Sequence, residues 1–264
     1  MTRQVDYPLA IVEPYINWLY FDHAWGMSGK PVHERQRLRE EALALLGEME
    51  GRYQTHAVFA LCKAHADGDD LLVDGVRIPM LRQQAAGGEH LCLADFVRPL
   101  SLGGSDRVGI FMATVDAAME ADYRGDDYLR MLSQTLADRL AEATAERLHE
   151  EVRKHYWGYA PDERLTPRQL HAEQYQGIRP AVGYPSLPDV SINFLLADML
   201  QAGRIGIRLT GHGMMTPHAS VSGLMLAHPK ARYFSIGKIG EDQLRDYAHR
   251  RGIPVELARR FLNM

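Results

Sequence analysis

The chain is poor in several features that would assign it to a familiar class. Of its 264 residues only Cys62 and Cys92 are cysteines, and they are too far apart for a Cys-x-x-Cys pair. We therefore expect two reduced thiols in a cytoplasmic protein. Lysine and arginine number 30 against 34 acidic residues, and the net charge of −4 gives no basic field for nucleic acid or an anionic membrane.

Long apolar runs and common catalytic motifs are also missing. No stretch reaches the roughly eighteen apolar residues of a membrane-spanning helix, and the polar N-terminus is unlike a signal peptide. No Gly-x-Gly-x-x-Gly follows a predicted strand, which disfavours a Rossmann-type methyltransferase. Asp67, Asp69 and Asp70 lack a closing glutamate, so a polar turn is expected there rather than a metal site. We assign no catalytic residue and no metal ligand.

What the chain does contain is a mixture of helical and strand patterns. Apolar residues at helical spacing predict an amphipathic helix over 34–53 and a long, largely buried helix over 128–156. Further helices are predicted over 190–202, 240–250 and 254–262. Short apolar runs between turn residues predict strands over 58–64, 71–78, 91–97, 203–210, 219–228 and 231–239. With no repeat and no linker, residues 1–264 are expected to form a single α+β domain.

Two features of this pattern suggest a binding site. Between Gly177 and Pro185 the chain places Arg179, Gly183 and Tyr184 in a loop stiffened by prolines. A guanidinium suits a carboxylate, glycine allows close approach of the backbone, and a tyrosine ring attracts a cation. S-adenosylmethionine carries both a carboxylate and a sulfonium, although a stiff surface turn is the alternative reading of the loop.

The long predicted helix holds a second feature. Glu142 lies among small residues, where an unpaired carboxylate would be costly, although a solvated helix charge remains the alternative.

Residues 126–161, together with the loop that follows them, resemble the reactivation domain of cobalamin-dependent methionine synthase. Similar segments recur in order at 14–18, 25–30, 67–73, 92–99 and 219–234, so the resemblance covers nearly the whole chain. It implies a C-shaped α+β domain, with a twisted, mainly antiparallel sheet flanked by helices and one long buried helix.

The resemblance also implies a function within methionine biosynthesis. Such a domain binds S-adenosylmethionine over a corrinoid and supports the reductive methylation of inactive cob(II)alamin, with an electron from flavodoxin. No segment resembles a cobalamin, folate or homocysteine module. We therefore expect a free-standing methyltransferase component that acts on cobalamin held by a partner chain, either a methionine synthase subunit or another corrinoid protein.

Carried over residue by residue, the resemblance gives a set of cofactor-binding positions. Arg179 matches the arginine that holds the carboxylate of the ligand. The other positions lie on the loop beneath the ligand, beside it, or at acidic sites near it: Ala181, Gly183, Tyr184, Tyr233, Phe234, Glu142, Glu173 and Asn17.

Three departures from the family pattern affect this expectation. Asn17 replaces the aspartate of Tyr-Ile-Asp-Trp, Phe234 replaces the second of two tyrosines, and residues 185–193 replace a loop with a histidine and charged residues. A neutral amide makes a weaker contact than a carboxylate, so weaker S-adenosylmethionine binding is expected. The alternative function is a non-catalytic cap or accessory subunit that has lost productive binding.

Overall fold

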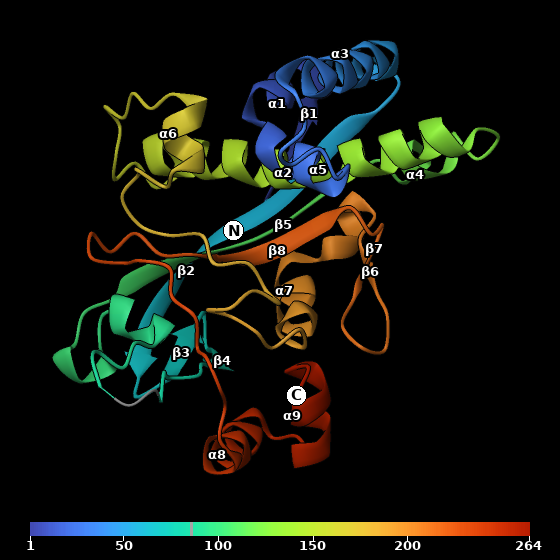
Figure 1. Cartoon of the computed structure of the whole chain (residues 1–264). Helices are drawn as coiled ribbons and strands as arrows, with labels where there is room; N and C mark the ends of the chain where they lie inside the picture. The colour runs from blue at the N-terminus through green and yellow to red at the C-terminus, as the bar shows by residue number, and fades with distance from the viewer. Residues whose placement is uncertain (85–86) are drawn as a thin grey trace.

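A curled antiparallel sheet runs through the centre of the computed structural model, which describes residues 1–84 and 87–264 (Figure 1). Its strands pair in the order β4-β3-β2-β5-β8, with β1 also paired to β2. They are β1 (Arg3–Pro8), β2 (Gln54–Asp67), β3 (Asp70–Val73), β4 (Val76–Pro79), β5 (Asp106–Val115) and β8 (Ser220–Met225). A separate two-stranded pair is formed by β6 (Arg208–Leu209) and β7 (Met215–Thr216).

Helices cover both faces of this sheet. Figure 1 shows α1, α2, α3 and α5 on one side of the long strands and α7 on the other, with α8 and α9 at the far end. Their bounds are α1 (Leu9–Val12), α2 (Trp18–Ala24), α3 (Val32–Met49), α4 (Ala117–Ala121), α5 (Asp127–Glu151), α6 (Pro167–His171), α7 (Ile192–Leu200), α8 (Glu241–Arg251) and α9 (Val255–Phe261).

The central strands are buried on both faces because successive side chains enter two different cores. In β2, Ala57 and Phe59 pack into the cluster beneath α5, whereas Val58 and Ala60 pack into the cluster that contains α7. This explains why the strands read as near-continuous apolar runs instead of alternating polar and apolar residues.

The long helix α5 crosses the sheet and forms one wall of the site described below. The Asp126 side chain caps its start by accepting hydrogen bonds from the backbone N–H groups of Tyr128 and Leu129, at 2.9 and 3.0 Å. Leucines and alanines cover most of its circumference and are buried. The helix continues as a π-helical turn over Val152–Tyr156, so the predicted helix over 128–156 is present with a changed final turn.

Several other predicted elements are confirmed. The helices predicted over 34–53, 190–202, 240–250 and 254–262 correspond to α3, α7, α8 and α9. The strand predictions over 58–64, 71–78 and 219–228 correspond to β2, the β3–β4 hairpin and β8. The predicted α+β class with a mainly antiparallel sheet is therefore correct.

Three strand predictions are wrong, because the backbone hydrogen bonds of these segments go elsewhere. Residues 91–97 contain a 3-10 helix, whose Asp95 side chain accepts from the Cys92 N–H at 2.8 Å. Residues 203–210 begin as a 3-10 helix between positive-φ residues and hold only the two-residue β6. Residues 231–239 form no strand, and the Ile236 N–H donates to the Pro185 carbonyl in a neighbouring loop at 2.9 Å.

The aspartates after β2 are engaged by arginines. Asp70 accepts from Arg77 at 2.6 Å and also pairs with Arg250, while Asp69 accepts from Arg82 at 2.6 Å. The pair with Arg250 ties the β3–β4 hairpin to α8. Within residues 1–84 and 87–264, no helix is both long and apolar enough to cross a membrane.

Candidate functional site

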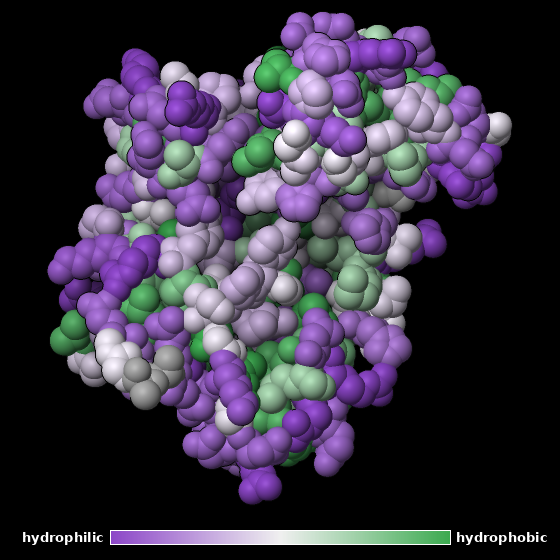
Figure 2. Space-filling model, viewed as in Figure 1, coloured by the Kyte–Doolittle hydropathy of each residue, from purple (hydrophilic) through white to green (hydrophobic). Residues whose placement is uncertain are grey.

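A cleft of about 760 Å³ lies between α2, α5, α6 and the segment 177–185, which we call the arginine loop. Figure 2 shows a hollow with polar walls between the regions of α2 and α6. The volume is in the range of small-molecule sites, which run to roughly 300–1,000 Å³. The walls are formed by Tyr15, Asn17, Tyr20, Arg139, Glu142, Ala143, Glu146, Leu170, His171, Glu173, Tyr175, Arg179, Pro180, Ala181, Tyr184, Pro185, Ser186, Tyr233, Phe234 and Ser235.

The arginine loop is docked on the edge strand β8. Ile178 and Leu226 exchange two backbone hydrogen bonds of 2.9 Å, and the Leu224 N–H donates to the Pro180 carbonyl at 3.0 Å. Such close approach requires glycine on β8, because a Cβ atom at Gly223 would overlap the Pro180 carbonyl oxygen. The loop is therefore an ordered extension of the sheet and not a free surface turn.

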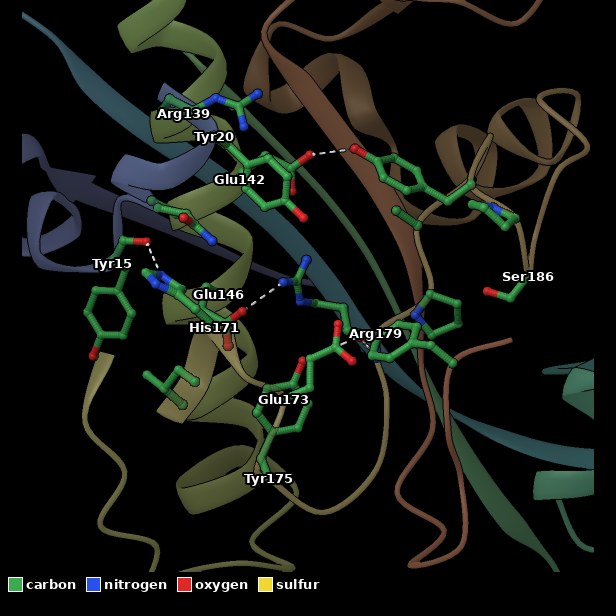
Figure 3. Close-up of a pocket in the computed structure, with 18 of the residues that line it drawn as sticks. Tyr15, Tyr20, Arg139, Glu142, Glu146, His171, Glu173, Tyr175, Arg179 and Ser186 are labelled. Atoms are coloured by element: carbon green, nitrogen blue, oxygen red, sulfur yellow. Dashed lines mark hydrogen bonds and ion pairs between the residues drawn. The ribbon is translucent and has the colours of Figure 1, made fainter. Parts of the chain in front are cut away.

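Arg179 lies in the cleft wall and is paired with a carboxylate of α5. Its Nη2 is 3.0 Å from Glu146 Oε2, and each side chain is only 10% exposed (Figure 3). Burial lowers the pKa of Arg179, but the charge of Glu146 more than offsets it, so the pKa is raised and the guanidinium stays protonated. The Arg179 backbone N–H donates to the Tyr233 hydroxyl oxygen at 2.9 Å.

A buried group of side chains supports the floor of the cleft. The Arg153 guanidinium binds both oxygens of Glu163, at 2.7 and 2.9 Å, and lies 4.2 Å from the Tyr175 ring centroid. The Tyr175 hydroxyl is 3.3 Å from that of Tyr233. A line of contacts thus runs from the π-helical turn after α5 to the hydroxyl that holds the arginine loop.

The other carboxylates of the cleft have different surroundings. The Tyr184 hydroxyl donates to Glu142 Oε1 at 3.1 Å, which links the arginine loop to α5 across the mouth (Figure 3). The charge of Glu142, followed by burial, raises the pKa of Tyr184 to about 12. Burial, followed by the charge of Glu146, raises the pKa of Glu173. The cleft therefore combines one buried cation with carboxylates that differ in hydrogen bonding.

The structure brings most of the predicted binding positions together. Asn17, Glu142, Glu173, Arg179, Ala181, Tyr184, Tyr233 and Phe234 all line the cleft. Gly183 does not. Its φ of 87° supports the turn of the loop, and an added Cβ would make only ordinary contact with Val190. Gly183 thus shapes the loop from behind the wall instead of bringing backbone close to a ligand.

Sequence reasoning missed several lining residues, of which Glu146 is the most significant. Glu146 stands four positions after Glu142, so both project from the same face of α5. That spacing is the signal from which it was predictable. Further lining residues with polar or aromatic side chains that were not predicted include Tyr15, Tyr20, Arg139, His171, Tyr175 and Ser186.

Asn17 has a local structural function. It is the N-cap of α2, and its Oδ1 accepts a hydrogen bond from the Leu19 N–H at 3.1 Å. Asparagine and aspartate cap helices about equally well, so the helix tolerates either residue. Only the charge presented to the cleft differs.

The altered segment 185–193 is anchored to the C-terminal helices. Asp189 is 1% exposed and accepts from the Tyr247 hydroxyl at 2.6 Å, from the Arg251 Nε at 3.2 Å and from the Ser191 hydroxyl at 2.9 Å. Of this segment, Pro185 and Ser186 reach the cleft. The polar side chains of Asp189 and Ser191 are therefore engaged in internal hydrogen bonds.

Comparison with known proteins agrees with this geometry. The family model described as "Vitamin B12 dependent methionine synthase, activation domain" matches residues 8–252. A crystal structure of the MetH reactivation domain bound to AdoHcy is similar over 100% of this chain and 89% of that chain, with 35% sequence identity and a TM-score of 0.93. The resemblance and the fold predicted from the sequence are both confirmed. The chain belongs to the family of activation domains of vitamin B12-dependent methionine synthase.

Proposed function

We propose that this chain binds S-adenosylmethionine in the cleft and supports the reductive methylation of cob(II)alamin held by a cobalamin-binding partner. The observation that carries the proposal is the convergence of Arg179 with the carboxylates Glu142 and Glu173 in one cleft. The similar domain crystallised with AdoHcy adds support, because AdoHcy is S-adenosylmethionine without its transferable methyl group.

The cleft residues suit the two ends of this ligand. A protonated guanidinium such as Arg179 binds a carboxylate through paired hydrogen bonds. Glutamates and the ring face of Tyr184 favour the cationic groups. S-adenosylmethionine itself supplies the electrophilic methyl group, so the protein contributes position and electrostatics.

The mouth of the cleft is the side on which a cobalamin partner would be met. Tyr20 and Tyr184 stand there with 58% and 53% of their surface exposed. Aromatic residues at the core of interfaces contribute much of their binding energy. A flavodoxin-like protein is proposed as the electron donor. The rival function, an accessory subunit without productive S-adenosylmethionine binding, is favoured by the neutral amide at Asn17.

Calorimetric titration with S-adenosylmethionine tests the proposal. The unmodified chain is expected to bind, and Arg179→Ala is expected to lower the affinity about 10- to 100-fold, because a hydrogen bond to a charged group is lost. Arg179→Lys keeps the charge without the planar fork and should give an intermediate affinity. In the second part of the test, the chain should restore turnover to an oxidised methionine synthase lacking its own activation domain.

Arg37→Ala is the matched control, because the Arg37 side chain is 81% exposed on α3 and does not line the cleft. It should bind like the unmodified chain. Absence of heat at millimolar S-adenosylmethionine, with a folded far-ultraviolet circular dichroism spectrum, would contradict the proposal and leave the accessory function.

A further inference from the structure

The three glutamates of the cleft are not equivalent as acceptors for a ligand. Glu142 already accepts a hydrogen bond from the Tyr184 hydroxyl. Burial, followed by the neighbouring Glu146 charge, raises the pKa of Glu173. Glu146 is buried and binds Arg179 through Oε2, while its Oε1 has no hydrogen-bond partner among the described residues.

An ionised oxygen without a partner is costly inside a protein, and nearby side chains do not supply one for Glu146. His149 follows one helical turn later, but neither of its ring nitrogens takes part in a hydrogen bond within the described chain. Burial, followed by the charges of Arg153 and Arg179, lowers the pKa of His149 well below its usual value, so the ring is neutral. A cationic donor from a ligand would satisfy Oε1.

The Arg179–Glu146 pair has one hydrogen-bond donor and one hydrogen-bond acceptor without a partner among the described residues. Arg179 Nε is a buried donor without a partner in the described structure, and Glu146 Oε1 is a buried acceptor without one. Both side chains line the cleft. An α-amino acid presents a carboxylate and an ammonium on one carbon, and the ion-paired Arg179 and Glu146 side chains carry the complementary charges.

The residue at the position of the family's aspartate cannot supply a negative charge. Asn17 is neutral, and its Oδ1 already accepts from the Leu19 N–H at the start of α2. The cleft therefore has to bind an ammonium group mainly through a glutamate. Glu146 is the one that is buried, ion-paired and incompletely hydrogen-bonded.

We propose that Glu146 accepts a hydrogen bond from the α-ammonium group of the ligand and so makes the cleft selective for a zwitterionic amino-acid end. The inference rests on the proposed function and assigns a specificity-determining residue within the same cleft. Arg179 and Glu146 then act as one unit that binds both charges of the amino acid.

The test compares Glu146→Gln with the unmodified chain by calorimetric titration of three ligands. These are S-adenosylmethionine, its decarboxylated form, which keeps the amine, and an analogue in which hydrogen replaces the α-amino group. The first two should bind about 10- to 100-fold more weakly to the variant, because a charged hydrogen bond is lost. The deaminated analogue should bind equally or more tightly, because no carboxylate repels its own carboxylate.

Glu151→Gln is the matched control. Glu151 lies on the same helix and pairs with Arg147 at 2.8 Å, but it does not line the cleft. The Glu151→Gln variant should bind all three ligands with the same affinity as the unmodified chain. Equal weakening of all three ligands by Glu146→Gln would assign a purely structural role and overturn the inference, as would no change at all. If the unmodified chain binds no S-adenosylmethionine, the proposed function itself fails.

Discussion

The guanidinium of Arg179 is held by residues far apart in the sequence. It lies 3.0 Å from Glu146 Oε2 on α5 and 5.8 Å from the Phe111 ring centroid on β5. The Tyr233 hydroxyl fixes its backbone from a third segment. Under the proposed function, a ligand carboxylate would therefore meet a guanidinium whose position is already set, which would reduce the entropy lost on binding.

His56 provides a pH-dependent contact at the start of the central strand. Its ring lies between Asp6, at 2.7 Å, and Asp116, at 3.0 Å. Burial lowers the pKa of His56, but the hydrogen bonds and charges of the two aspartates more than offset it, so the net shift is upward. The contact joins β1, β2 and the end of β5.

Removal of the His56 side chain should therefore lower the free energy of unfolding more at acidic pH than at alkaline pH. A histidine whose pKa is higher in the folded state contributes its full stabilisation at a pH below its unfolded-state pKa of about 6.5. This contribution disappears as the pH rises through its folded-state pKa. Urea unfolding should show that His56→Gln costs about 0.5–1 kcal/mol at pH 5.5, a small value because the aspartates are partly exposed. The cost should shrink at pH 9. An equal cost at both pH values would contradict the charged contact.

Single residues were predictable from the sequence where local chemistry marks them. Arg179 and Tyr184 stand between prolines and glycines, and this pattern predicts a stiff turn that either binds a ligand or lies on the surface. Glu146 was not predictable with the same ease, because α5 is a 25-residue helix with many charges, most of which would be solvated in isolation. Only the folded chain places Arg179 beside it.

At the scale of elements, the docking of the arginine loop on β8 positions side chains that line the cleft. Gly223 lets the two backbones approach, because an added methyl group would meet the Pro180 carbonyl oxygen and lie 3.0 Å from the Ala181 Cα. Gly223→Ala should therefore displace the loop. We expect a loss of about 1–3 kcal/mol in the free energy of unfolding, as for other overpacked sites, together with weaker S-adenosylmethionine binding.

Gly47→Ala is the control for this substitution. A Cβ atom at Gly47 would meet no atom within 4 Å, and the residue lies inside α3. The change should leave ligand binding unaffected and stabilise the protein by up to about 1 kcal/mol. If Gly223→Ala unfolds at the same urea concentration as the unmodified chain, the loop does not depend on close packing against β8.

Elements with their own periodicity were predicted well, and those defined by distant partners were not. The spacing of Leu132, Leu136 and Leu140 marks α5 from the sequence alone. Residues 231–239 have the composition of a strand, but the Ile236 N–H donates to Pro185 of the arginine loop and the Ala231 N–H donates to His228. No local pattern contains that information.

At the scale of the whole molecule, the two largest hydrophobic clusters share the sheet. Phe59 and Phe111 belong to the cluster beneath α5, while Val58 and Ile110 on the same strands belong to the cluster that contains α7. Because neither cluster can lose β2 or β5 without exposing the other, we propose that residues 1–264 unfold as one cooperative unit. Binding in the cleft would then stabilise both sides together.

The chain carries a separate probe for each cluster. All three tryptophans pack against the cluster beneath α5, whereas Cys62 and Cys92 are buried in the other cluster. Burial is the main cause that raises the pKa of each thiol to about 12, so both cysteines should be unreactive in the folded protein.

In a urea series, tryptophan fluorescence and pulsed thiol labelling should give the same midpoint. Saturating S-adenosylmethionine should shift both midpoints upward by the same amount, because a ligand that binds only the folded state stabilises the whole cooperative unit. Thiol labelling at a lower urea concentration than the fluorescence change would show that the α7 side unfolds independently. The chain would then unfold as two cooperative units and not as one.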